Sequence, residues 1–177
     1  VLNQLPKDKY MVIDMAFSAQ TSSNQTQDIV DGSLTRRKKG HFGPPVGKRC
    51  ILFVDDLNMP SKEKYGAQPP IEILRQLLDQ GGWYDLKDKE RPFAHILDFN
   101  FISAMGPPGG GRTFITPRIT RHLNLVSFTN FDDDTLKRIF NTILHWYFGN
   151  NGFPADIVKL ENKLVTGTLE IYQKAME

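Results

Sequence analysis

Two adjacent carboxylates, Asp55 and Asp56, are the side chains whose type and position most suggest chemistry. They end a run of apolar residues, 50–54, which predicts a strand buried on both faces of a parallel sheet. Two ionised carboxylates there are costly unless a cation shares the site. Mg²⁺ on a nucleoside triphosphate, held through water by the first carboxylate, meets that need in a Walker-B motif. The alternative interpretation is a buried strand followed by a solvated turn.

Alternating strands and helices must position these carboxylates. Residues 35–49 are basic and rich in Gly and Pro, which predicts an exposed loop or hairpin, and 83–98 read as an irregular or hairpin insertion. Hydrophobic periodicity and capping signals set the remaining elements. Further strands are expected at 10–19, 99–105 and 123–128, and helices at 22–34, 69–80 and 116–122.

The pattern becomes purely helical near residue 130. Three aspartates, 132–134, favour a helix N-terminus, and apolar residues then follow at helical spacing as far as Tyr147. Pro154 begins a last helix. A domain boundary is therefore expected at 129–131, which gives an α/β domain over 1–130 and a helical domain over 131–177.

Composition sets modest limits on function. The chain has 177 residues, 40% of them hydrophobic, with a net charge of +2, so one domain, or one and part of another, is expected. The charge gives no global argument for nucleic acid or a membrane surface. Its single cysteine, Cys50, opens the apolar run and is expected to be a small buried hydrophobe. The four histidines show no metal-ligand spacing, and a start at Val without a targeting pattern suggests a piece of a longer protein.

The segment from Gly106 to Thr113, GPPGGGRT, imitates a phosphate-binding loop with Arg112 in place of lysine. Such a loop aims consecutive backbone N–H groups at phosphate, and Pro107 and Pro108 have none. It must also lead into a long helix, whereas Pro117 leaves room only for a short one. A flexible or catalytic-edge loop after a parallel strand is the preferred interpretation.

Taken together, these segments resemble the third AAA+ module of the motor ring in dynein heavy chains. The similarity rests on FSAQTSSNQTQDI, GPPVGKR, VDDLNMP, KYGAQPPIEILRQLLDQGGWYD, AMGPPGGGR and TPRITRH, in that order, and covers nearly the whole chain. The resemblance implies a P-loop NTPase fold of the AAA+ type, with a Rossmann-like parallel sheet followed by the start of a helical lid. It also implies that the first strand, the Walker-A loop and the first helix lie before residue 1.

Site roles follow from the resemblance by position. Asp55 resembles the Walker-B carboxylate for Mg²⁺ and ATP, and Asp56 stands where the family has a water-polarising Glu. Gly106 stands where many modules carry a sensor Asn. Both departures put fast hydrolysis in doubt, because Asp is one methylene shorter and glycine cannot orient water. Arg121 resembles an arginine finger that acts in trans on the neighbouring module, with Arg118 as the alternative.

The resemblance therefore implies part of an ATP-binding module in a microtubule-based motor, and the departures point to the axonemal type, in cilia or flagella. Its partners would be neighbouring AAA+ modules, other dynein chains and, through distant parts of the parent protein, the microtubule; neither nucleic acid nor membrane is expected. This piece alone is expected to lack ATPase activity. Two alternatives remain: a structural or regulatory module that binds nucleotide without significant hydrolysis, and a ring ATPase outside dynein.

Overall fold

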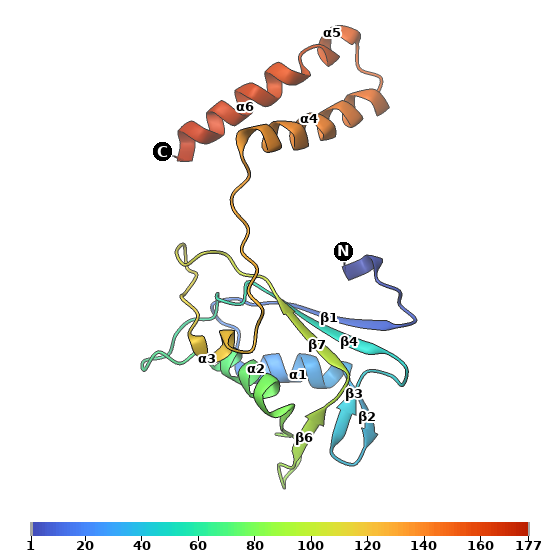
Figure 1. Cartoon of the computed structure of the whole chain (residues 1–177), viewed down its shortest axis with the longest axis vertical. Helices are drawn as coiled ribbons and strands as arrows, with labels where there is room; N and C mark the ends of the chain where they lie inside the picture. Colours follow the sequence, from blue (N-terminus) through green and yellow to red (C-terminus); the bar gives the residue numbers. More distant parts are fainter. Residues whose placement is uncertain (1, 177) are drawn as a thin grey trace. The chain divides into compact units, whose positions relative to one another are not determined.

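The chain divides into two compact units between Leu125 and Val126. A computed structural model describes residues 2–176, with the side chains of 2–175, and both units are drawn in Figure 1. The division falls a few residues before the change in sequence pattern near residue 130. Each unit is described separately below.

A three-stranded parallel sheet forms the centre of the first unit. Its strands are β1 (Tyr10–Ala16), β4 (Arg49–Asp55) and β7 (Phe99–Ser103), in the order β1-β4-β7. The central strand β4 is buried along most of its length, as its apolar sequence predicts, and the expected α/β fold with a parallel sheet is confirmed. The register places Asp55 beside Ala16 at the carboxyl edge.

Two helices, α1 (Ser23–Ser33) and α2 (Pro69–Gln80), accompany the sheet and contact each other. Ser22 caps α1 in a capping box, because its side chain accepts from the Gln25 N–H while the Gln25 side chain accepts from the Ser22 N–H. Gly81 ends α2 in the left-handed conformation at φ 68°. Both helices match the sequence prediction closely.

One hydrophobic core joins these elements. Trp83 and Leu74 are fully buried in it, and the indole N–H of Trp83 donates to Asp31 Oδ1 at 3.0 Å. Burial raises the pKa of the Asp31 carboxyl, while the Trp83 bond opposes that rise. Burial also raises the pKa of Cys50 to about 11, in agreement with its interpretation as a buried hydrophobe. Other buried members are Ile13, Met15, Phe17, Val30, Leu52, Val54, Leu57, Ile71, Leu77, Ile96, Ile115 and Ile119.

A second, four-stranded sheet gathers the two segments expected to be loops or hairpins. Its order is β2 (Thr35–Lys38), β3 (His41–Gly43), β6 (Phe93–Ile96) and β5 (Gly82–Tyr84). The hairpins agree with the sequence, but the parallel pairing of β3 with β6 joins them in a way that no local pattern predicted. A β-carbon at Gly82 would overlap the carbonyl oxygen of Ala94, so the approach of β5 to β6 requires glycine there.

The prediction of a strand at 123–128 is wrong. A short helix, α3 (Pro117–Thr120), lies within the expected range 116–122, but the chain after it is irregular and mostly exposed coil. At the other end of the unit, a 3-10 turn at Leu2–Gln4 precedes β1. Val126 and Phe128 are 75% and 91% exposed. β-prone residues form a strand only where a neighbouring strand supplies a hydrogen-bonding edge, and within the described residues this segment has none.

The second unit is helical, as predicted. It contains α4 (Asp133–Asn150), α5 (Ala155–Val158) and α6 (Glu161–Met176), and Asp132 caps α4 by accepting from the Thr135 N–H. The single helix expected from Pro154 is instead interrupted at Lys159 and Leu160. No helix among residues 2–176 has the length and apolar character needed to cross a bilayer.

Candidate functional site

Asp55 lies at the carboxyl edge of the parallel sheet, where the sequence placed it. It is the last residue of β4, and its backbone oxygen accepts from the N–H of Phe17, just beyond the end of β1. Its side chain is exposed, and Oδ1 accepts from the backbone N–H of Asp56 at 2.8 Å. A solvent-facing carboxylate at this edge is well placed for a hydrated cation.

Asp56 has a different environment from Asp55. Its backbone is left-handed at φ 50°, which is uncommon for a residue with a side chain. Its Oδ1 accepts from Nε and Nη2 of Arg112 at 3.2 and 3.1 Å. This role of Arg112 was not predicted from the sequence. The available signal was a cation in the Gly-rich loop that follows the neighbouring parallel strand.

The loop that carries Arg112 is fixed at both ends by Asn58. The buried Asn58 side chain donates from Nδ2 to the carbonyl oxygens of Gly106 and Thr113, at 2.8 and 3.1 Å. Thr113 donates its N–H back to the backbone carbonyl oxygen of Asn58, and the buried Gln68 side chain donates to Thr113 Oγ1. Both ends of the loop are therefore anchored. Only a short helix follows it, as the sequence predicted when it argued against a phosphate-binding loop.

Among the described residues, neither Arg118 nor Arg121 forms a hydrogen bond or ion pair with Asp55 or Asp56. Arg118 forms two hydrogen bonds with Glu72 of α2, from Nε and Nη2 at 3.1 and 3.0 Å, and these bonds hold the pKa of the Glu72 carboxyl below its usual range. Arg121 donates to Asp79, further along α2, at 3.2 Å. Both side chains are more than half exposed, so either could face a partner surface.

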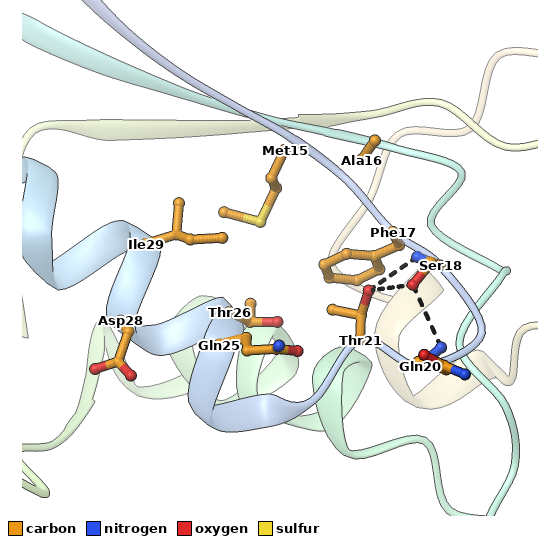
Figure 2. A pocket seen from close by; sticks show the side chains of 10 residues that line it. All are labelled: Met15, Ala16, Phe17, Ser18, Gln20, Thr21, Gln25, Thr26, Asp28 and Ile29. Carbon is orange, nitrogen blue, oxygen red and sulfur yellow. Dashed lines mark hydrogen bonds between the residues drawn. The ribbon is translucent and has the colours of Figure 1, made fainter.

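A groove of about 500 Å³ lies between the end of β1 and the first turns of α1 (Figure 2). Its rim is polar: the Ser18 N–H and hydroxyl contact Thr21 Oγ1, and the Gln20 N–H donates to Ser18 (Figure 2). Neither Asp55 nor Asp56 lines it. The groove offers no basic side chain for a phosphate, so the carboxylate edge is the stronger candidate site.

Comparison with known proteins gives one family and several relatives. The family described as "P-loop containing dynein motor region" matches residues 1–131. The chain is 49% identical over 176 residues to dynein axonemal heavy chain 12 of Mus musculus, and 53% identical over 176 residues to dynein axonemal heavy chain 3 of Homo sapiens. Each similarity covers 99% of this chain, but only 6% and 4% of the relative. Dynein axonemal heavy chain 1 of Homo sapiens is 57% identical over 136 residues, which are 76% of this chain and 3% of that protein.

Proposed function

This chain belongs to the family of P-loop-containing dynein motor regions, and from that premise we propose that it supplies the Walker-B half of an ATP site. The observation that carries the proposal is Asp55, an exposed carboxylate at the end of the buried central strand β4. In this proposal residues 1–130 form the large α/β subdomain of an AAA+ module, the third of the ring. Residues 131–177 form the first helices of its lid.

The residues present fit a magnesium ion that is shared with phosphate. No group of three or more His, Cys, Asp or Glu side chains among the described residues could hold a metal by itself. Mg²⁺ bound to a nucleotide needs fewer protein ligands, because waters and phosphate oxygens complete its coordination shell beside one or two carboxylates. Asp55 would hold the ion through water, and the ion would neutralise phosphate charge there.

Arg121 is proposed as an arginine finger acting on the neighbouring module, with Arg118 as the alternative. Support comes from its exposed guanidinium and from the absence of any contact with Asp55 in the described residues. Its contact with Asp79 is a surface ion pair, and such pairs contribute little stability. Arg121 could therefore leave Asp79 at little cost and bind a phosphate, which carries more charge. The planar guanidinium suits a phosphate better than an ammonium does.

A second candidate function is a regulatory module that retains nucleotide without significant turnover. The specific observation in its favour is the pairing of Asp56 with Arg112. A carboxylate whose direction is fixed by two N–H bonds to one oxygen cannot turn freely to take a proton from water. In either case we propose that the parent heavy chain serves an axonemal, microtubule-based motor, with neighbouring AAA+ modules and other dynein chains as partners.

The test is nucleotide binding to the heavy-chain motor region that carries this module, with the other nucleotide sites inactivated. We expect Asp55→Asn to weaken Mg²⁺-dependent binding of a fluorescent ATP analogue by about 10–100-fold, the range for residues that orient a metal shell. Asp14→Asn is the matched control, because Asp14 is an exposed carboxylate within β1 that pairs with Phe53, two residues before the strand's end. Equal binding by the Asp55 and Asp14 variants would contradict the assignment.

A further inference from the structure

Arg112 and Asp56 form an ion pair that is held by two hydrogen bonds. Two nitrogens of one guanidinium donate to a single carboxylate oxygen, and the two side chains are 38% and 35% exposed. Partly shielded, charge-assisted pairs with two hydrogen bonds are stronger than single contacts in water. The pair links the turn after β4 to the loop after β7.

Gly106 provides the space in which Arg112 lies. A β-carbon at Gly106 would stand 2.9 Å from both Cδ and Nε of Arg112 and 3.4 Å from its Cζ. Contacts below 3.0 Å are not tolerated, so a side chain at this position must displace the arginine. Gly106 is not among the glycines with positive φ in the described chain, whereas Gly109, Gly110 and Gly111 are. The absence of a side chain at residue 106 is therefore explained by room for Arg112.

The rest of the loop delivers Arg112 to this position. A tight turn pairs Gly109 with Arg112 through two backbone hydrogen bonds of 3.0 Å. The Asn58 side chain holds the carbonyl groups on both sides of the loop, at Gly106 and Thr113. With its ends anchored and its tip folded back, the loop holds the guanidinium against Asp56.

We propose that Arg112 is a positioning residue that clamps Asp56, and that Gly106 is part of the same device. The proposal rests on the proposed function, since the clamp matters for turnover only if Asp56 faces a nucleotide. Arg112 binds Oδ1 and thereby fixes the direction of the whole carboxylate group, Oδ2 included, so the group cannot turn to take a proton from a water elsewhere in the site. Withdrawal of Arg112 frees the carboxylate, so the clamped form retains nucleotide and the released form permits proton transfer.

Hydrogen exchange in the nucleotide-free motor region tests the clamp directly. We expect Arg112→Met, Asp56→Asn and Gly106→Ala each to speed amide exchange in residues 106–113 by about three- to tenfold. Combining Gly106→Ala or Asp56→Asn with Arg112→Met should add little further, because all three remove one interaction. Arg37→Met is the matched control: Arg37 also pairs with a left-handed aspartate, Asp98 at φ 54°, which precedes β7 and so stands at the opposite end of that strand from this loop. Fully additive effects would overturn the clamp.

Two further readouts separate positioning from loop packing. Arg112→Lys keeps the charge and should retain much of the protection that Arg112→Met loses, whereas a packing role for the side-chain stem would make the two variants alike. Arg112→Met should also leave the dissociation constant of the ATP analogue within about twofold and raise the single-turnover hydrolysis rate about tenfold. A weakened affinity with an unchanged rate would contradict the proposal. Coupled exchange in a motor whose module binds no ATP would uphold the clamp and overturn the proposed function instead.

Discussion

The sheet unit and the helical unit place their large apolar side chains differently. In the sheet unit, Leu52, Leu74 and Trp83 are at most 1% exposed and belong to one continuous core. In the helical unit, Trp146 and Ile171 are 66% and 72% exposed, and Phe148, Val165 and Leu169 are the buried apolar residues recorded there. The sheet unit therefore derives its stability from a closed core, whereas the helical unit depends on a narrow seam between α4 and α6.

The largest expected effect is a cavity in the sheet core. Leu74→Ala should lower the free energy of opening of α2 by about 2–5 kcal/mol, because the fully buried side chain leaves a space that rigid neighbours cannot fill. Hydrogen exchange of α2 peptides in the motor region measures this change. The control is Ile29→Ala on α1, where the side chain is 45% exposed and the expected loss is within about 1 kcal/mol. Similar losses for both variants would mean that the core is not closed.

The seam of the helical unit should be less sensitive. Phe148→Ala is expected to cost about 2 kcal/mol, below the roughly 3–5 kcal/mol typical of a Phe in a closed core. The rings of Tyr147 and Phe153 stand 6.3 and 5.0 Å from Phe148 and border solvent, so they can move into the space. Exchange of α4 peptides gives the measurement. A cost as large as that of Leu74→Ala would remove the distinction between the units.

A smaller effect concerns pH at the surface of the sheet unit. Hydrogen bonds from Arg118 and then Arg75 hold the pKa of Glu72 below its usual value. A carboxyl with a lowered folded-state pKa contributes stability above its unfolded pKa of about 4.3, and that contribution is lost as pH falls through the folded value. Glu72→Gln should therefore reduce the stability of α2 slightly at pH 7 and flatten its decline on acidification. If the Glu72→Gln variant lost stability on acidification as steeply as the unchanged protein, this linkage would be disproved.

The smallest effect is expected at the most exposed part of the helical unit. Trp146→Gln should change the stability of α4 by no more than about 0.5 kcal/mol, because two thirds of the side chain already faces solvent. Hydrogen exchange of α4 peptides measures this change. A large loss would show that Trp146 is covered in the intact protein and would narrow the contrast with Leu74.

Local signals in the sequence predicted the elements whose stability is local. The capping box at Ser22 and the Pro69 to Gly81 punctuation placed both helices correctly, and the apolar run placed β4. The strand expected at 123–128 failed because strand formation depends on a partner edge, which composition does not report. Periodicity likewise indicated which helical residues are apolar, but not how far each is covered.

The candidate site was predictable to the same degree. Asp55 could be placed at the sheet edge because strand ends and carboxylates are visible in the sequence. The pairing of Asp56 with Arg112 spans 56 residues and depends on how two loops meet, so no spacing rule indicates it. The exposed arginines in and directly after α3 were identified, but their carboxylate partners Glu72 and Asp79 on α2 were not.

The strand order also bears on how the first unit folds. In the main sheet Tyr10 pairs with Arg49 and Cys50 with Phe99, so each pairing must close a loop of about 40–50 residues. By contrast, β2 and β3 are neighbours in the chain, and their hairpin closes across the short turn at Lys39 and Gly40. Long-range parallel pairing is slow, whereas hairpins form within microseconds. The small sheet's hairpins are therefore expected to form early, and the carboxyl edge that presents Asp55 to be assembled late, when β4 finds both neighbours.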